Sequence, residues 1–156
     1  MKRMENSILK NKNCLITGAT GGLGKEIAIE LAKRGVNLFL TSKKQDLQKL
    51  QLEIKKNNNE IIIEYQCVDL RHDDGVKTLI ENVHKKFSSI DILINCAGEN
   101  HRKPLSESTI EEYDSCMNLN VRAPFVLSKE FSKDMIKNKW GRIVNIASSS
   151  AHNGFK

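Results

Sequence analysis

The chain has 156 residues, of which 39% are hydrophobic and 28% are charged. This balance is typical of a globular domain with its own core, and it excludes a disordered chain. The formal charge of +6 comes from 25 Lys and Arg against 19 Asp and Glu, and the basic residues lie in scattered pairs. Because nucleic acids favour a concentrated basic stripe, we expect no nucleic-acid partner.

The N-terminal residues and the cysteines indicate the compartment. Residues 1–13 are polar and basic without the apolar core of a signal peptide, and no run has the length of a membrane span, so we expect no membrane partner. The gaps between Cys14, Cys67, Cys96 and Cys116 match no zinc or redox spacing. The sequence therefore predicts buried free thiols, no metal site and a cytoplasmic protein.

Apolar runs alternate with amphipathic segments from end to end. The strands are expected at residues 14–17, 36–41, 61–68, 90–95 and 142–147. The helices are expected to begin near Leu23, Gln45, Asp73 and Thr109, with Asp73 as a capping residue and Pro124 as a kink in the last helix. In the first helix, Leu23, Ile27 and Leu31 share one side.

Strands separated by helices favour parallel pairing through right-handed crossovers. We predict an α/β fold, a Rossmann-type doubly wound parallel sheet in a single NAD(P)-binding domain over residues 1–156. A sheet of this type has the strand order 3-2-1-4-5-6. Only five strands are present in the 156 residues, so we expect the C-terminal part of the fold to be missing and the fifth strand to be an open edge.

Residues 17–24 form a glycine-rich turn, Thr-Gly-Ala-Thr-Gly-Gly-Leu-Gly, between the first strand and the first helix. Gly18 permits a tight turn, Gly22 lets the backbone approach a pyrophosphate, and Gly24 lets the helix lie close to the sheet. The helix N-terminus offers unpaired N–H groups to phosphates. The predicted cofactor-binding turn comprises Gly18, Ala19, Thr20, Gly21, Gly22, Leu23 and Gly24. The alternative is a flexible turn without a ligand.

Three further motifs follow in order. Asp69-Leu70 ends the third strand, Asn95-Cys96-Ala97-Gly98 ends the fourth, and residues 141–148 read Gly-Arg-Ile-Val-Asn-Ile-Ala-Ser. Together with the glycine turn they resemble the shorter branch of the short-chain dehydrogenase/reductase family, including reductases of 3-oxoacyl carrier-protein thioesters. The resemblance implies that Asp69 and Leu70 hold the adenine, and that Asn95, Ala97 and Gly98 also bind the cofactor. Taken singly, Asp69 and Asn95 could be strand-end residues.

The same resemblance implies the chemistry. Ser148 would hydrogen-bond the substrate oxygen, although its serine run could also be a polar loop, and Asn120 would hold a water in a proton relay. A Tyr with a Lys four residues later would act as general acid or base. The only tyrosines are Tyr65 and Tyr113, and neither is followed by such a Lys. Residues 99–108 are expected at the rim of the substrate pocket.

Two functional hypotheses remain. In the first, the chain is a fragment, inactive alone, of an NAD(P)(H)-dependent oxidoreductase that moves a hydride between nicotinamide and a carbonyl or alcohol substrate. In the second, it is a non-catalytic nucleotide-binding or assembly protein of the same fold. Members of the family form homo-oligomers through their fourth and fifth long helices, and because only the first of these is present, the oligomeric state stays open.

The end of the second strand bears on the choice of cofactor. Residues 40–44 contain no acid, which would accept hydrogen bonds from the ribose of NAD and repel a 2′-phosphate. By resemblance, Ser42 stands where NAD-preferring members carry Asp, and Lys43 stands where NADP-preferring members carry Arg. We predict NADP(H) as the cofactor in preference to NAD. The alternative is that Lys43 and Lys44 belong to a solvated helix start.

Overall fold

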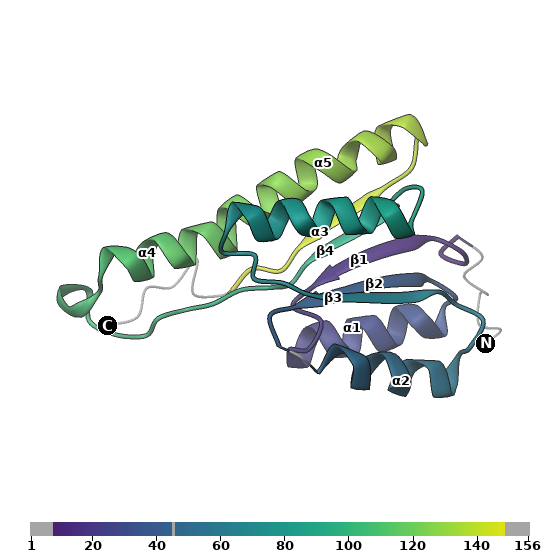
Figure 1. The fold of residues 1–156 in the computed structure, drawn as a ribbon, viewed down its shortest axis with the longest axis horizontal. Coiled ribbons are helices and arrows are strands. Elements are labelled where there is room, and N and C mark those ends of the chain that lie inside the picture. Colours follow the sequence, from purple (N-terminus) through teal and green to yellow (C-terminus); the bar gives the residue numbers. More distant parts are fainter. Residues whose placement is uncertain (1–7, 45, 149–156) are drawn as a thin grey trace.

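The structure, a computed structural model, describes residues 8–44 and 46–148. Its centre is a parallel sheet with the order β3-β2-β1-β4-β5 (Figure 1). The strands are β1 (Asn13–Thr17), β2 (Asn37–Ser42), β3 (Ile63–Cys67), β4 (Ile92–Asn95) and β5 (Arg142–Asn145). The predicted fold class, strand number and parallel order are therefore confirmed.

Helices cover both faces of the sheet. Figure 1 shows α1 (Gly22–Lys33) and α2 (Leu47–Asn57) on one face, and α3 (Asp73–Lys86) with α5 (Ala123–Lys137) on the other. A 3₁₀ turn, η1 (Leu105–Glu107), precedes α4 (Ile110–Met117). None of the helices in the described ranges is long and apolar enough to cross a membrane.

Alternate residues of each strand enter two separate cores. Cys14 and Ile16 of β1 face α1 and α2, whereas Leu15 faces α3 and α5. β2 and β4 divide in the same way, with Phe39 and Leu93 in the core under α3 and α5. Both sides of these strands are buried, which explains why they appear in the sequence as continuous apolar runs rather than alternating ones.

Helix α1 differs from the sequence expectation. Its buried ridge is Gly24, Ala28 and Ala32, whereas Leu23 is 53% exposed. Ile27 and Leu31 only flank the core. The small residues form the face of α1 that packs on the sheet, because they let the helix lie closer to the sheet than Leu side chains would. Leu23 is thereby left beside the glycine turn instead of in the core.

The start of α3 also differs. Asp73 was expected to cap this helix, but His72 occupies the cap position and Asp73 is the first helical residue. The Asp73 carboxylate instead accepts two hydrogen bonds from the guanidinium of Arg122, at 2.7 and 2.8 Å. A bidentate, charge-assisted pair competes well against a single capping bond.

The long final helix is interrupted before Pro124 rather than at it. Thr109 caps α4 through a capping box with Glu112, as expected of the residue that opens the helix. A π-helical turn, η2 (Asn118–Arg122), then joins α4 to α5, and Pro124 lies in the first turn of α5. Because Pro has no N–H to donate, the regular ladder cannot run through this position.

The cysteines are all free, but only one is fully buried. Cys14 lies in the core, where burial raises the pKa of its thiol far above the ordinary value. Cys96 and Cys116 are half-buried, and Cys67 is exposed at the end of β3. The prediction that all four are buried was wrong, because Cys67 closes an edge strand whose outer residues alternate toward solvent.

Candidate functional site

The glycine-rich turn forms the floor of the candidate site. Gly18 has φ +66°, a conformation that favours glycine, and a side chain there would come within 2.8 Å of the Ala97 backbone. A side chain on Gly24 would overlap the Gly18 carbonyl. Gly22, in contrast, has nothing within 4 Å of the position of an added Cβ. The turn therefore requires two of its glycines for the fold, whereas Gly22 faces open space.

The turns after β1 and β4 are fastened to each other. Thr17 Oγ1 accepts hydrogen bonds from the backbone N–H groups of Cys96 and Ala97, each at 3.0 Å. The Ala19 N–H donates to Thr41 O at 3.0 Å, which ties the same turn to β2. β1 and β4 are the strands between which the chain order of the sheet reverses. Parallel α/β sheets bind ligands in the crevice outside the carboxyl ends of such strands.

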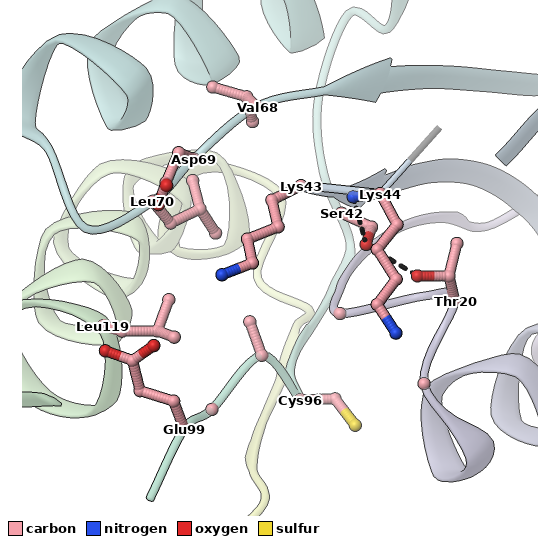
Figure 2. Close-up of a pocket in the computed structure, with 14 residues that line it drawn as sticks. Thr20, Ser42, Lys43, Lys44, Val68, Asp69, Leu70, Cys96, Glu99 and Leu119 are labelled. Atoms are coloured by element: carbon pink, nitrogen blue, oxygen red, sulfur yellow. Dashed lines mark hydrogen bonds between the residues drawn. The ribbon is translucent and has the colours of Figure 1, made fainter. Parts of the chain in front are cut away.

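A pocket of about 250 Å³ lies at this crevice (Figure 2). Nine of the fourteen predicted cofactor-binding residues line it: Gly18, Thr20, Gly21, Ser42, Lys43, Asp69, Leu70, Ala97 and Gly98. The other five lie outside the lining. Ala19, Gly24 and Asn95 are buried behind it, while Gly22 and Leu23 are exposed on the first turn of α1.

Five further residues line the pocket: Lys44, Val68, Cys96, Glu99 and Leu119. Lys44, Val68 and Cys96 are neighbours of predicted residues, so the motifs already pointed to their positions. Glu99 belongs to the segment 99–108 expected at the rim. Leu119 comes from η2, and no motif marked it, because its approach depends on how the long helix crosses the sheet edge.

Two cations project from the end of β2. Figure 2 shows the ammonium groups of Lys43 and Lys44 directed into the pocket. Within the described residues neither forms an ion pair. Ser42 lies between them and the glycine turn, because its hydroxyl bonds Thr20 Oγ1 at 2.7 Å and accepts from Lys44 N at 3.2 Å. The arrangement offers two positive charges and two hydroxyls close to the N-terminus of α1, which suits an anionic ligand.

The wall opposite the lysines carries Asp69. Its carboxylate accepts from the backbone N–H of Arg71 at 3.0 Å and from Arg71 Nε at 2.9 and 3.0 Å, and it also pairs with Arg71 Nη2. The side-chain hydrogen bonds from Arg71, more than its charge, lower the pKa of Asp69 to about 2. Asp69 is therefore ionised at neutral pH and acts only as an acceptor. Sequence reasoning did not identify Arg71.

Asn120 connects η2 to the segment after β4. Its Oδ1 accepts from Glu99 N at 3.0 Å, and its Nδ2 donates to Glu99 O at 2.8 Å and to Cys116 Sγ at 3.1 Å. One acceptor position on Oδ1 remains. Ser148 is exposed and lies three residues beyond β5. Neither predicted catalytic residue belongs to the pocket lining.

Asn95 lies at the end of β4, as its motif predicted, but outside the pocket lining. It is 3% exposed at the end of β4, and its Nδ2 donates to Asn145 Oδ1 at 2.8 Å and to Ser128 Oγ at 3.4 Å. These contacts join β4 to β5 and α5.

The residues that the structure describes contain no cluster of three His, Cys, Asp or Glu side chains that could hold a metal.

The family model described as short chain dehydrogenase matches residues 12–156. The chain belongs to the short-chain dehydrogenase family. Its sequence is 36% identical over 141 residues to a 3-oxoacyl-[acyl-carrier-protein] reductase, FabG, of Buchnera aphidicola subsp. Schizaphis graminum, which covers 90% of this chain and 56% of the relative. The chain thus spans a little over half the length of that short-chain dehydrogenase.

Solved structures of the family have the same fold. A metagenomic short-chain oxidoreductase in complex with NADP is 30% identical, with a TM-score of 0.88, and the match covers 96% of this chain and 66% of that one. NAD⁺-bound xylitol dehydrogenase is 28% identical, with a TM-score of 0.84, and the match covers 94% of this chain and 56% of that one. Solved structures similar to this chain therefore include one with NADP and one with NAD⁺.

Proposed function

We propose that this chain is the nucleotide-binding part of an NADP(H)-dependent oxidoreductase that acts on a carbonyl or alcohol substrate. One observation carries the proposal: the glycine turn at the start of α1 and the ammonium groups of Lys43 and Lys44, which form no ion pair with residues 8–44 or 46–148, meet in one pocket. The turn suits a diphosphate, and the lysines suit a further phosphate on the ribose. The bound cofactor would supply or accept the hydride.

The residues fit such a cofactor as follows. The backbone of Gly18 to Gly24, with the open space before Gly22, would hold the diphosphate. Lys43 and Lys44 would hold the 2′-phosphate, with Ser42 and Thr20 beside them. Asp69, Leu70, Ala97 and Gly98 would lie along the adenosine, whereas Asn95 would support this wall from behind.

The proposed chemical roles rest on the resemblance. Ser148 would orient the substrate oxygen, and Asn120 would hold a water through its remaining acceptor position. No tyrosine of this chain fits the role of general acid. Tyr65 lies in β3 and Tyr113 in α4, and neither lines the pocket or is followed four residues later by Lys. We therefore propose that the 156-residue chain binds cofactor without turning over a substrate.

The alternative is a non-catalytic nucleotide-binding protein of the same family. The presence of Ser148 and Asn120 favours the enzyme over this alternative. Restoring activity by joining a segment with the Tyr-x-x-x-Lys motif of a relative would support the fragment. Continued inactivity of a folded, cofactor-binding fusion would support the alternative.

The partners and location are also proposals. A carbonyl or alcohol compound is the expected substrate, because the relative FabG is named a 3-oxoacyl-[acyl-carrier-protein] reductase. A cytoplasmic location agrees with the four free cysteines, since thiols persist in reducing compartments. Self-association through the exposed side of α4 and α5 is compatible with its apolar residues, Ile110, Tyr113, Met117, Val121 and Phe125.

Titration of the purified chain with reduced cofactors tests the proposal. We expect NADPH to bind with a lower Kd than NADH, measured by the fluorescence of the reduced nicotinamide. The preference should fall as ionic strength rises, because salt screens the attraction between exposed lysines and the phosphate. Equal or tighter binding of NADH would contradict the choice of NADP(H), and binding of neither would contradict the proposed function.

A further inference from the structure

Arg71 holds the Asp69 carboxylate from one side. The two residues share the loop between β3 and α3, and the guanidinium approaches both carboxylate oxygens while the Arg71 backbone N–H donates to Oδ1. Such a fork fixes the plane of the carboxylate as well as its position. Asp69 therefore has one orientation at the pocket wall rather than a range of rotamers.

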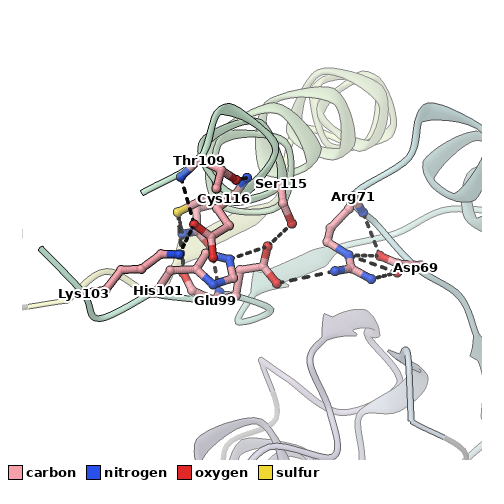
Figure 3. Close-up of polar contacts among 10 residues, drawn as sticks. Asp69, Arg71, Glu99, His101, Lys103, Thr109, Ser115 and Cys116 are labelled. Carbon is pink, nitrogen blue, oxygen red and sulfur yellow. Dashed lines mark hydrogen bonds and ion pairs between the residues drawn. The ribbon is translucent and has the colours of Figure 1, made fainter. Parts of the chain in front are cut away.

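Arg71 is itself anchored to the neighbouring loop. Its Nη1 lies 3.9 Å from Glu99 Oε2, across the gap between the loops that follow β3 and β4 (Figure 3). The Glu99 carboxylate accepts a hydrogen bond from the hydroxyl of Ser115 in α4. The side-chain amide of Asn120 hydrogen-bonds both the backbone N–H and the backbone carbonyl of Glu99. The guanidinium thus lies between two carboxylates, and one of them is fastened to α4 and η2.

The Asp69 carboxylate keeps capacity for one more hydrogen bond. Three N–H groups of Arg71 make four contacts with the carboxylate, because the Nε–H is shared between Oδ1 and Oδ2. Three protons therefore serve a group that has about four acceptor positions. The Asp69 side chain is 29% exposed and lines the pocket. Because the carboxylate is ionised, it attracts a donor and repels the lone pairs of a carbonyl oxygen.

We propose that Arg71 is a positioning residue that sets the choice of purine base in the pocket. By fixing Asp69, it favours a base with an amino group at the contacting position over a base with a carbonyl oxygen there. This inference rests on the proposed function, because it presumes that the pocket binds a dinucleotide. It adds a residue outside the recognised motifs and a basis for distinguishing adenine from hypoxanthine.

The test compares NADPH with its analogue that carries hypoxanthine in place of adenine. Both are titrated into the unsubstituted chain and into Arg71→Gln, with the reduced nicotinamide as the fluorescent probe. A hydrogen bond to a charged group corresponds to a preference of about tenfold for adenine in the unsubstituted chain. We expect this ratio to fall to about twofold in Arg71→Gln, because Asp69 is then free to turn away. Arg71→Lys keeps the charge without the fork and should lower the ratio similarly.

Arg122→Gln is the matched control. It also removes a bidentate Arg–Asp pair between two elements, but its partner Asp73 does not line the pocket. Any general loosening of the fold in this variant should weaken the binding of both dinucleotides equally, so that the preference for adenine stays near tenfold. Thermal unfolding of each variant identifies one that does not fold, in which case Arg71→Lys provides the comparison.

The outcomes separate the inference from the proposed function. If neither dinucleotide binds the unsubstituted chain, the proposed function is wrong. If both bind without a preference, or if the preference survives in both Arg71 variants, the role of Arg71 is wrong while the proposed function stands. A ratio that falls in Arg122→Gln as much as in Arg71→Gln would also overturn the role of Arg71.

Discussion

Lys43 and Lys44 are the side chains on which the choice of nicotinamide cofactor depends. Both are exposed, so each attraction to a phosphate is screened by water and salt. The two lysines together indicate a phosphate site, because both ammonium groups enter one pocket beside the hydroxyls of Ser42 and Thr20. A single lysine at the start of a helix would not by itself identify a phosphate site.

Replacing Lys43 with Ala should weaken NADPH binding while leaving NADH binding nearly unchanged. The expected loss is about 1 kcal/mol, or roughly fivefold in Kd, because the lysine is exposed. Fluorescence titration with both cofactors measures it. Lys55→Ala, an exposed lysine on α2, is the control and should change neither Kd. Equal weakening of NADH and NADPH by Lys43→Ala would show that the residue does not contact the 2′-phosphate.

Asp69 is expected to make the stability of the folded chain depend on pH in the acidic range. Its pKa is lowered from 3.8 to about 2 by the hydrogen bonds from Arg71. A depressed carboxyl pKa stabilises the folded state above the unfolded value, and this contribution is lost as pH falls from about 4 toward 2. The shift corresponds to at most about 2 kcal/mol, and partial exposure reduces it to about 1 kcal/mol.

Urea unfolding of the parent chain and of Asp69→Asn checks this at several pH values. The difference in unfolding free energy should be greatest at pH 5 to 6 and should shrink steadily below pH 4. Asp46→Asn serves as a comparison, because its lysine partner is exposed and its pair is a simple i,i+3 contact. A difference for Asp69→Asn that stays constant from pH 6 to pH 3 would contradict the assigned ion pair.

At the scale of elements, the capping box of α4 also attaches the loop that precedes this helix. Thr109 Oγ1 accepts from the Glu112 N–H at 3.3 Å, and the Glu112 carboxylate accepts from the Thr109 N–H at 3.0 Å. Lys103 contacts the same carboxylate, at 2.6 Å, and so attaches the loop to the helix (Figure 3). The capping box therefore stabilises both α4 and the rim of the pocket.

Thr109→Ala should lower the free energy of unfolding by about 1 kcal/mol, because the Glu112 N–H loses the side-chain oxygen that accepts its hydrogen bond. Denaturant unfolding measures the change. Thr78→Ala, within α3 and exposed, makes the same chemical change away from a cap, and should be neutral or slightly stabilising. If the two variants have the same stability, the capping box contributes nothing in solution.

Strands and motif-bearing turns were predictable, because local sequence determines them. β1, the glycine turn and the start of α1 follow from an apolar run, glycines at fixed offsets and an amphipathic segment. The Arg71–Glu99 pair was not predictable, since its members come from loops after different strands and carry no motif. The π-helical turn at η2 depends likewise on how the whole helix meets the sheet, although Pro124 marked its vicinity.

At the scale of the whole molecule, burial is uneven across the sheet. β1, β2 and β4 are covered on both faces, whereas all four residues of β5 are exposed. Ile143, Val144 and Ile146 leave 39 to 42% of their surface in water. β5 pairs only with β4 among the described strands, so this edge can accept a further strand or layer. The pocket in which we propose that the nucleotide binds lies outside the carboxyl ends of the buried strands β1 and β4.

The most direct test of the account uses Gly22. A Cβ added there has nothing in the protein within 4 Å, and we propose that the diphosphate occupies this open space at the start of α1. Gly22→Val should leave the unfolding temperature nearly unchanged and weaken NADPH binding at least about tenfold, measured by calorimetric titration of the 156-residue chain. A folded Gly22→Val variant that binds NADPH as tightly as the parent chain would contradict the assignment of the glycine turn as the cofactor site.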